Sequence, residues 1–421
     1  MLSAAQLAEM SKTELNELAK TFDIAAPVKI KKDELAAQIL EIAAARSGLE
    51  MANGVLDILP EGYGFLRRSG YLPGADDIYI SQSQIRRFEL RRGDLVAGQV
   101  RKPKDNEKYY GIVKVETVNG FDPEAVRNRP HFDALPAVHP TGRYTLEQRG
   151  VVSTRIIDLF APIGKGQRML VAAPPKAGKT TLIKEIANAL GSNHPGTEVI
   201  AVLVDERPED VTDLTGSIAG EVVATTFDEH PDMHLNVAEL VLERAKRIVE
   251  LGGDAVIVLD SITRLTRAYN TAQPASGRTI PGGLEAAALF RAKRYFGSAR
   301  SIEGGGSLTI VATVFVETGA KIDDQIYEEF RRGANAEIHL SRLLADARIY
   351  PAIDVKASGT RHEELLLSEL ELRKVWLLRR ATVAMHATDF AELVLERIGK
   401  TKANADFLTA ITDRAVAALK A

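Results

Sequence analysis

Residues 168–191, RMLVAAPPKAGKTTLIKEIANALG, constrain the fold more than any other stretch of the chain. The apolar run 169–172 is typical of a short buried strand, and after the loop 173–180 apolar residues recur at helical spacing: Leu182, Ile183, Ile186, Ala187 and Leu190. Backbone N–H groups in a tight loop that opens a helix bind anions, because the positive end of the helix dipole lies behind them. This order of strand, loop and helix predicts a site for a nucleoside triphosphate.

The residue types within the loop fit this chemistry. Gly178 lets the backbone approach the phosphates, Lys179 is expected to reach the β- and γ-phosphates of ATP, and the hydroxyl of Thr180 is expected to hold Mg²⁺. Ala173 stands where the general pattern GxxxxGK[ST] has glycine, and an ordinary connection between a strand and a helix is the alternative. The flanking strand and helix favour a nucleotide site formed by Pro174, Pro175, Lys176, Ala177, Gly178, Lys179, Thr180 and Thr181.

Length and composition limit the remaining possibilities. A chain of 421 residues is long enough for about two to four domains, and its hydrophobic fraction of 45% is that of a globular protein. The net charge of −3 gives no sign of nucleic-acid binding, so any such function must lie in a local patch. The absence of cysteine excludes disulfides and thiolate sites. The first residues lack the features of a signal peptide, and no apolar run is long enough for a membrane helix, so we expect a cytoplasmic protein without a membrane partner.

The part of the chain before the phosphate loop divides into three regions. Residues 1–47 are expected to be helical, with a capping box in SKTE and a basic run at 29–32 that is either a solvated turn or a weak nucleic-acid contact. Residues 48–119 contain short apolar runs separated by turn residues, which predicts a small β-barrel of the oligonucleotide-binding (OB), cold-shock-like type: 55–59, 63–66, 78–80, 94–100 and 111–118. Residues 120–150 are rich in proline and are expected to form an extended connector.

Residues 151–421 have the pattern of an α/β nucleotide-binding domain with a helical tail. The strand candidates are nearly continuous apolar runs, as expected for a parallel sheet covered on both faces: 169–172, 199–204, 255–259 and 308–316. A helix is predicted over 237–251, where Gly252 and Gly253 end the periodic pattern. This alternation of strands and helices predicts a doubly wound arrangement.

Two of these strand candidates end in acidic residues. Asp260 closes the run 255–259 and is a candidate ligand of Mg²⁺, with a helix-capping role as the alternative. Glu206 follows the run 199–204 and is the candidate base that orients and deprotonates the attacking water. Its alternative is a surface ion pair with Arg207, which is also assigned to the nucleotide site. Ligands of open α/β sheets bind beyond the carboxyl ends of the strands, so we expect both carboxylates at the nucleotide.

The barrel region contains a candidate platform for nucleic-acid bases. The strand period places Tyr63, Phe65 and Arg67 on one face. Because an arginine seldom shares a buried face with two aromatic residues, we expect this triplet to face outward and to stack single-stranded bases, at about 1–3 kcal/mol per base. Nearby tyrosines are further candidates, although the last of them fits the barrel core better: Tyr79, Tyr109 and Tyr110. The RNA-binding residues assigned to the barrel are Tyr63, Phe65, Arg67, Tyr79, Glu107 and Tyr109.

Two further features favour an RNA ligand. The segment 84–114 has nine basic and four acidic residues, and this excess of positive charge fits a groove that follows phosphates. Further along the chain, two glycine-containing loops each offer one cation, at Arg278 and Lys321. Alone these loops mean little, since most such loops only connect elements.

Several motifs together resemble the Rho family, bacterial RNA-dependent ATPases that terminate transcription and translocate along RNA as a ring. The motifs are GVLDILPEGYGFLR, DDIYISQSQIRRFELRRGDLVAGQVR, GQRMLVAAPPKAGKTTL, LVDERPEDVTD and SGTRHEELLL, and the resemblance extends over nearly the whole chain. Many ATPases share the phosphate loop, but its combination with the barrel motif and SGTR is specific. The Rho family departs from the general pattern in the same way at the position of Ala173.

The resemblance implies a RecA-like ATPase that forms a homo-hexamer, with nucleotide sites between subunits. Arg361 of SGTR would then be an arginine finger that reaches the neighbour's γ-phosphate, and Arg348 a second interfacial cation. Tyr350 would stack on the adenine, and Lys176 would be a further phosphate contact. The catalytic set expected on this basis is Lys179, Glu206, Arg348 and Arg361.

The resemblance also implies that the loops of Arg278 and Lys321 line a central channel and grip RNA through its backbone. Two positions depart from the family pattern. Arg278 stands where the family usually has lysine, which keeps the charge but changes the geometry, and RGAN at 332–335 stands where the family has GTGN. Both departures concern the grip on RNA and the coupling between subunits, and leave the ATPase assignment intact.

With this resemblance, the sequence is expected to encode an ATP-dependent RNA translocase with 5′-to-3′ helicase activity that terminates transcription, and the resemblance implies single-stranded RNA and RNA polymerase as partners. One alternative is a RecA-like ATPase subunit of a rotary or secretion machine, which has no reason to display Tyr63, Phe65 and Arg67 beside a basic segment. A non-catalytic RNA-binding protein with a relic nucleotide fold is a second alternative, which the presence of Lys179 and Asp260 disfavours.

Overall fold

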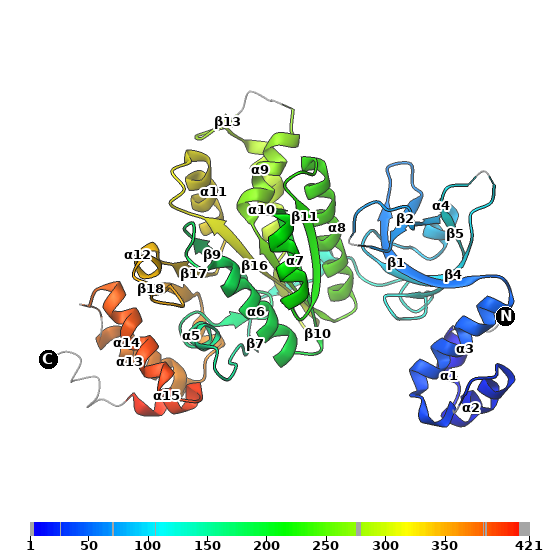
Figure 1. The fold of residues 1–421 in the computed structure, drawn as a ribbon, viewed down its shortest axis with the longest axis horizontal. Coiled ribbons are helices and arrows are strands. Elements are labelled where there is room, and N and C mark those ends of the chain that lie inside the picture. Colours follow the sequence, from blue (N-terminus) through cyan, green and yellow to red (C-terminus); the bar gives the residue numbers. More distant parts are fainter. Residues whose placement is uncertain are drawn as a thin grey trace. The chain divides into compact units, whose positions relative to one another are not determined.

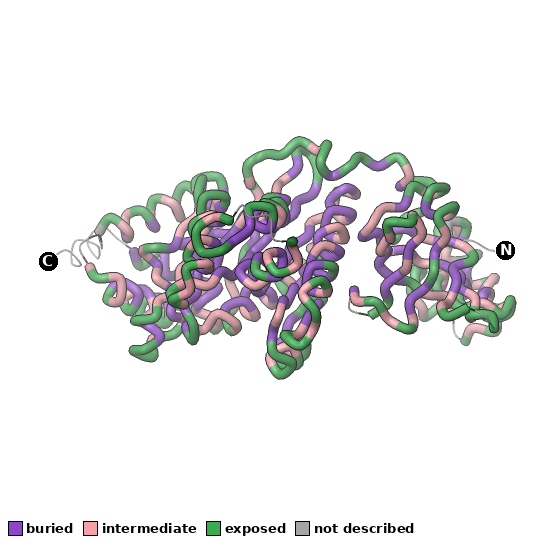
Figure 2. Tube along the Cα trace, turned by 90° about the horizontal axis from the view of Figure 1, so that it is seen from above, coloured by how far each residue is buried: buried purple, intermediate pink, exposed green. Residues whose placement is uncertain are grey.

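The computed structural model describes residues 4–25, 27–69, 71–105, 107–274, 279–381, 383 and 385–411. They form two compact units, which are considered separately. The first comprises Met1–Phe132 and Leu240–Leu251, and the second comprises Asp133–Glu239 and Gly252–Ala421. Buried residues run through the interior of each unit (Figure 2). Of the helices in the described ranges, none combines the length and apolar character that crossing a membrane requires.

The first unit starts with three α-helices packed around Leu15, Leu35 and Ile39: α1 (Ala4–Glu9), α2 (Lys12–Thr21) and α3 (Lys32–Arg46), with a 3₁₀ turn at Pro27–Lys29. The predicted capping box is confirmed, since Ser11 accepts a hydrogen bond from the Glu14 backbone and donates its own backbone N–H to the Glu14 carboxylate. These contacts fix the start of α2.

A closed five-stranded barrel follows, in the order β1-β2-β3-β5-β4, which confirms the OB-type prediction. Its elements are β1 (Glu50–Ile58), β2 (Gly64–Arg67), β3 (Ile78–Ile80), α4 (Gln82–Arg87), β4 (Leu95–Arg101) and β5 (Tyr110–Val118). Gly54 lies on β1 where a Cβ atom would come within 2.7 Å of the Arg67 carbonyl oxygen, so glycine permits the close approach of β1 and β2. Tyr110 packs against the barrel core, as expected.

The second unit is built on a nine-stranded sheet, whose main path runs β11-β10-β12-β16-β9-β17-β18 (Figure 1). The pairs from β11 to β17 are parallel, and β18 is antiparallel. The strands of this unit are β6 (Ala137–Val138), β7 (Arg143–Tyr144), β8 (Ile163–Gly164), β9 (Arg168–Ala173), β10 (Thr197–Glu206), β11 (Glu221–Thr226), β12 (Asp254–Asp260), β13 (Thr279–Ile280), β14 (Leu284–Glu285), β15 (Arg300–Ile302), β16 (Ser307–Phe315), β17 (Ala336–Leu340) and β18 (Ile353–Thr360).

Helices cover both faces of this sheet (Figure 1). The helices from residue 152 on are α5 (Val152–Phe160), α6 (Lys179–Asn193), α7 (Pro208–Ser217), α8 (Pro231–Glu250), α9 (Ile262–Ala272), α10 (Ala286–Phe296), α11 (Lys321–Arg331), α12 (Arg342–Asp346), α13 (Glu369–Ala381), α14 (Ala387–Gly399) and α15 (Asn404–Ala410), with 3₁₀ turns at Phe132–Ala134 and Glu363–Leu365. The part of α8 from Leu240 on belongs to the first unit. One large core joins α6 to alternate residues of the strands, such as Val171, Ala201 and Val258. The predicted doubly wound fold and helical tail are thus confirmed.

Candidate nucleotide site and RNA-binding face

The phosphate loop lies between β9 and α6, as predicted. Gly178 is the N-cap of α6 and has φ = 88°, a left-handed conformation that glycine adopts without strain. Lys179 is the first residue of the helix, and Thr180 follows it. Pro174 and Ala177 are buried, whereas Pro175, Lys176 and Thr181 are exposed on the loop and the first turn. Exposed backbone at a helix start is the arrangement that binds phosphate.

The sheet brings the two predicted carboxylates to this loop. β10 and β12 are parallel neighbours with Leu203 opposite Asp260, so their carboxyl ends meet at one edge. Lys179 Nζ lies 2.5 Å from Asp260 Oδ1 and 3.5 Å from Glu206 Oε1. Both carboxylates are buried, which strengthens their attraction for the ammonium group. Lys179 must therefore leave these two carboxylates in order to bind the phosphates of a nucleoside triphosphate.

Asp260 fits the role of a magnesium ligand. Its Oδ1 accepts a hydrogen bond from Thr313 at 2.7 Å, whereas its buried Oδ2 has no hydrogen-bond partner among the described residues. A buried carboxylate oxygen without a partner, on a residue whose other oxygen contacts the lysine of the phosphate loop, suits Mg²⁺, which takes few protein ligands and completes its shell with phosphate and water. The helix-capping alternative is wrong, because Ser261 is the N-cap of α9 and accepts the Arg264 N–H.

Glu206 is held by a residue that the sequence did not single out. Arg264 of α9 lies with Nη1 at 2.7 Å from Glu206 Oε1, and the same nitrogen donates to the Asp205 carbonyl at 2.5 Å. Arg207 is exposed at the start of α7, so the ion pairs of Glu206 are not the predicted surface pair. Its carboxylate lies at the phosphate loop with a fixed direction, as a base that acts on water requires.

A pocket of about 420 Å³ adjoins the loop and is large enough for a nucleobase and ribose. Tyr350 forms one wall with 49% of its surface exposed, as stacking on a base requires. Ser153 and Glu185 also line the pocket, and the Ser153 hydroxyl donates a hydrogen bond to the Glu185 carboxylate. The sequence analysis missed the pocket residues outside the loop, because they come from α5, α6 and the ends of β17 and β18: Val151, Val152, Ser153, Glu185, Leu340 and Pro351.

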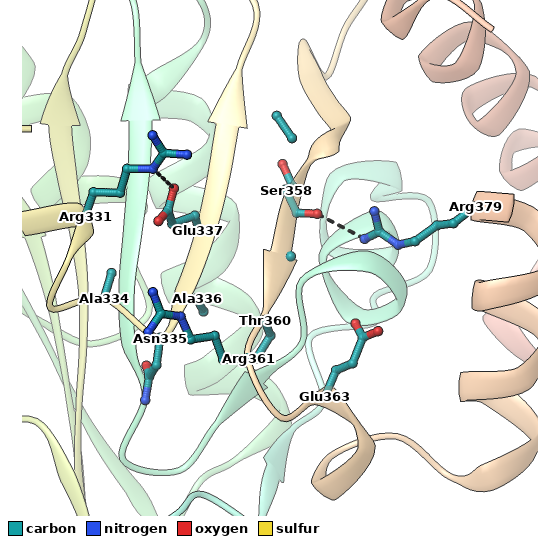
Figure 3. Close-up of a pocket in the computed structure, with 12 residues that line it drawn as sticks. Arg331, Ala334, Asn335, Ala336, Glu337, Ser358, Thr360, Arg361, Glu363 and Arg379 are labelled. Carbon is teal, nitrogen blue, oxygen red and sulfur yellow. Dashed lines mark hydrogen bonds and ion pairs between the residues drawn. The ribbon is translucent and has the colours of Figure 1, made fainter. Parts of the chain in front are cut away.

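Arg361 belongs to a different pocket. It follows β18, is exposed, and lines a hollow of about 430 Å³ together with Asn335, Arg331 and Arg379 (Figure 3). Three arginines and two glutamates line this hollow, and burial together with the nearby guanidinium groups of Arg300 and Arg361 lowers the pKa of Arg168. Among the described residues that line the base pocket, neither Arg361 nor Arg348 occurs. Arg348 is exposed with φ = 62°.

Of the two residues predicted to line a channel, the structure describes Lys321 only. Lys321 is the exposed first residue of α11, at the end of the loop that leaves β16. Arg278 lies outside the described residues, and the short hairpin of β13 and β14 follows it. Its predicted role therefore stays a prediction from the sequence.

The barrel gathers its predicted aromatic residues into one cluster. The ring centroids of Tyr63 and Phe65 are 6.0 Å apart, Tyr79 lies 5.7 Å from Tyr63, and Tyr109 lies 4.8 Å from Phe65. The rings meet at steep or tilted angles, and Tyr79 is 40% exposed. Partly exposed rings of this kind provide faces and edges on which unpaired bases stack.

The prediction that Arg67 faces outward is wrong. Arg67 shares the face of Phe65, with its guanidinium 5.5 Å from that ring, but only 8% of the residue is exposed. Its nitrogen atoms lie 2.7 Å from Asp57 Oδ2 and 2.5 Å from Asp77 Oδ2. The aspartates neutralise the arginine and allow its burial beneath the aromatic cluster, since a buried charge requires a partner.

The excess of basic over acidic residues in the segment 84–114 leaves fewer unpaired cations in the structure than the sequence suggested. Most of its cations have carboxylate partners, including Arg91 with Glu250 and Arg101 with Glu107. Hydrogen bonds from Arg101 hold the pKa of Glu107 at about 2, so this carboxylate is negative at neutral pH. Lys108 projects its ammonium group 5.2 Å from the Tyr109 ring, beside the cluster.

Comparison with known proteins finds family matches to the barrel and to the nucleotide-binding domain. Residues 52–124 match the family described as Rho termination factor, RNA-binding domain, and residues 153–360 match the nucleotide-binding domain of the ATP synthase alpha/beta family. Solved structures with related folds include an ATPase from a type III secretion system, with a TM-score of 0.54 and 21% identity over 69% of this chain and 88% of that one. An ATP synthase subunit from Nanoarcheaum equitans has a TM-score of 0.55 and 17% identity over 68% of this chain and 78% of its own.

Closer relatives match nearly the whole chain. Transcription termination factor Rho from Bacillus subtilis strain 168 is 52% identical over 408 residues, which cover 96% of this chain and 95% of that protein. Transcription termination factor Rho from Escherichia coli strain K12 is 47% identical over 414 residues, which cover 96% of this chain and 98% of that protein. The chain therefore belongs to the Rho family of transcription termination factors.

Proposed function

We propose that the protein is an RNA-dependent ATPase that captures nascent single-stranded RNA, translocates along it with 5′-to-3′ helicase activity and terminates transcription by RNA polymerase in the cytoplasm. The observation that carries the proposal is the presence, in one chain, of a clustered aromatic face on an OB barrel and a phosphate loop with two buried carboxylates. The names of the full-length relatives support it.

The proposal divides the work between the regions predicted from the sequence. The barrel, residues 48–119, binds RNA first through the assigned residues Tyr63, Phe65, Arg67, Tyr79, Glu107 and Tyr109, with Arg67 supporting Phe65 from below. The ATPase domain, residues 151–421, then grips RNA with the loops of Arg278 and Lys321. The helical residues 1–47 and the connector 120–150 complete the chain.

Hydrolysis follows from the geometry of the phosphate loop. Glu206 takes a proton from water as the water oxygen bonds to the γ-phosphorus and the bond to the β–γ bridging oxygen breaks. Lys179 stabilises the negative charge that develops on the phosphates, and Arg207 and Lys176 offer further cations. Thr180 and Asp260 would hold Mg²⁺, which neutralises phosphate charge when bound.

The site requires a second copy of the chain in this proposal. Arg361 lies in a pocket of its own and not in the base pocket beside Tyr350, so it is available to a nucleotide held by a neighbouring subunit. Arg348 acts at the same interface. A homo-hexameric ring would place six such pairs of half-sites around RNA, a number that rests on the family resemblance.

The experiment is an ATPase assay of the purified chain with and without a long, unstructured, pyrimidine-rich RNA, alongside its mass in solution. We expect turnover to be low without RNA and to rise when RNA is added, with a multimeric mass. Equal turnover in both conditions would contradict the coupling. RNA binding that persists after Tyr63→Ala and Phe65→Ala would instead favour an ATPase subunit of a rotary or secretion machine.

A further inference from the structure

The pocket beside the phosphate loop contains a carboxylate that neither the nucleotide nor the RNA assignment uses. Of the described residues that line this pocket, Glu185 alone is charged, and the other side chains are apolar or carry a hydroxyl group. Glu185 follows Thr181 by four residues on α6, so the two side chains lie on the same side of the helix. A base in this pocket therefore meets a group that accepts hydrogen bonds and donates none.

Tyr350 determines how a base lies in the pocket. Its ring packs over the phosphate loop, because a Cβ atom at Gly178 would lie 3.9 Å from the ring atoms Cδ1 and Cε1. The Tyr350 hydroxyl donates a hydrogen bond to the Ala345 carbonyl at 3.4 Å, which holds the ring near the end of α12. Stacking on this ring uses the face of a base and leaves its edge free to hydrogen-bond to the few polar groups of the pocket.

Ser153 holds one oxygen of the Glu185 carboxylate. Its hydroxyl donates a hydrogen bond to Glu185 Oε2, and Ser153 itself is 2% exposed in the first turn of α5. No other group within the described ranges hydrogen-bonds to Glu185 or pairs with its charge. Glu185 is partly buried, and a carboxylate in that position is unfavourable without donors. Its second oxygen, Oε1, is therefore available to a donor on a ligand.

A free carboxylate oxygen distinguishes purines by the group at position 6. Adenine carries an amine there, which donates hydrogen bonds, whereas guanine and hypoxanthine carry a carbonyl oxygen, which accepts them. A carbonyl oxygen next to Oε1 would place two acceptors together in a partly buried pocket, which costs free energy. Guanine also donates from N1 and N2, but a contact through both groups requires both carboxylate oxygens, and Ser153 already occupies Oε2.

We propose that Glu185 selects the base of the nucleotide by accepting a hydrogen bond from the 6-amino group of adenine, and that Ser153 positions its carboxylate for this contact. The inference rests on the proposed ATPase function and adds the feature of the nucleotide that the site recognises. The ligand class is a 6-aminopurine nucleotide, whose base stacks on Tyr350 and whose phosphates lie on the loop that begins α6. Nucleotides of 6-oxopurines bind more weakly, because they have no donor at position 6.

The test measures equilibrium binding of nucleoside diphosphates to the full chain in the presence of Mg²⁺ and without RNA. It therefore depends neither on turnover nor on activation by RNA. ADP and inosine diphosphate (IDP) are the informative pair, because their bases differ only at position 6 and in the proton on N1. We expect ADP to bind about tenfold to a hundredfold more tightly than IDP, since IDP loses a hydrogen bond to a charged group. GDP is expected to bind about as weakly as IDP.

Two variants separate the roles of Glu185 and Ser153. Glu185→Gln supplies an amide, which donates as well as accepts, so ADP should bind more weakly, IDP more tightly, and the preference should fall to within about threefold. Ser153→Ala frees Oε2, so both carboxylate oxygens become available to the N1 and N2 protons of guanine. GDP should then gain on ADP by about tenfold, whereas IDP, which has no amine at position 2, should gain much less. Equal weakening of all three diphosphates would overturn the positioning role of Ser153.

Glu198→Gln is the matched control. It removes the same charge from an exposed glutamate near the start of β10 that does not line the pocket, so the preference for ADP should stay unchanged. Equal affinities of the unchanged protein for ADP and IDP, or a preference that survives Glu185→Gln, would overturn the inference while the proposed function stands. Turnover that does not respond to RNA would overturn the proposed function and leave the base preference intact. If the chain binds none of these nucleotides, both are wrong.

Discussion

The aromatic face of the barrel and the nucleotide site differ in how their charged groups are arranged. On the barrel, the rings of Tyr63, Phe65, Tyr79 and Tyr109 are partly exposed. Of the two cations described beside these rings, Arg67 is neutralised by two aspartates and Lys108 is exposed. At the phosphate loop, Lys179 and Arg264 are the cations, and they are held by Glu206 and Asp260. The aromatic face can therefore stack bases with little net charge, whereas the charged groups of the nucleotide site are paired with one another.

This difference indicates how each site is switched on. The aromatic face is complete within one chain, and because every base has a flat face to stack on, it has no need of rearrangement or of a fixed RNA sequence. The nucleotide site must exchange its internal ion pairs for contacts with phosphate, and Arg361 lies in a separate pocket. Variants of the two sites therefore distinguish a preformed site from an incomplete one.

The largest effect is expected from Arg361→Ala. An arginine finger contributes about 10³- to 10⁵-fold to turnover, so the variant should lose nearly all ATPase activity while RNA capture persists. Lys179→Ala should be equally inactive. If each site is shared between chains, mixing the two inactive variants should restore part of the activity, because some interfaces receive an intact phosphate loop and an intact finger.

This mixing experiment decides whether the site is incomplete. The controls are the two variants assayed separately, and each should stay inactive. Absence of recovery in a mixture whose mass shows co-assembly would mean that Arg361 serves the nucleotide of its own chain, and the contrast with the barrel would disappear.

Arg67→Gln is expected to destabilise the barrel by about 3–5 kcal/mol, because it leaves the buried Asp77 without its cation and Asp57 with Arg92 alone. The loss should appear as faster hydrogen exchange of the β2 amides in the full chain. Arg68→Gln alters the exposed neighbouring arginine and should have little effect. If Arg67→Gln weakened RNA binding without any change in exchange, Arg67 would be a direct contact and not a support.

Tyr63→Ala and Phe65→Ala should each weaken RNA capture by about 1–3 kcal/mol, or roughly fivefold to 150-fold, with the ATP site unaffected. Binding of a short pyrimidine RNA in the absence of nucleotide measures the effect. Phe121→Ala removes another exposed aromatic residue of the same unit and serves as the control. Equal losses in all three variants would show that the cluster has no special role.

The sequence was sufficient where the chemistry is local. The loop before α6, the acids at the ends of β10 and β12, and the five strands of the barrel follow from runs of neighbouring residues, and all are present. A hydrophobic pattern and a loop motif specify such elements because their causes lie within a few residues of each other.

The sequence failed where a partner comes from another strand. Arg67 was expected to face outward because an arginine seldom shares a buried face with two aromatic residues, but Asp57 lies opposite Phe65 in the register of β1 and β2 and pairs with Arg67. Arg264 likewise depends on the adjacency of β10 and β12, which the order of strands along the chain does not reveal. The only available signal was its position one turn beyond the cap of α9, where a side chain can point back to the strand ends.

The smallest effect concerns the electrostatic part of the barrel face. Lys108 is exposed beside the Tyr109 ring, in a segment where many cations already have carboxylate partners. If Lys108 neutralises one RNA phosphate, Lys108→Gln should reduce the slope of log affinity against log salt by about 0.7. Lys29→Gln, in the basic run of the helical region, should leave that slope unchanged if the run is a solvated turn. An unchanged slope for Lys108→Gln would mean that this face binds RNA by stacking alone, which makes its contrast with the charged nucleotide site sharper still.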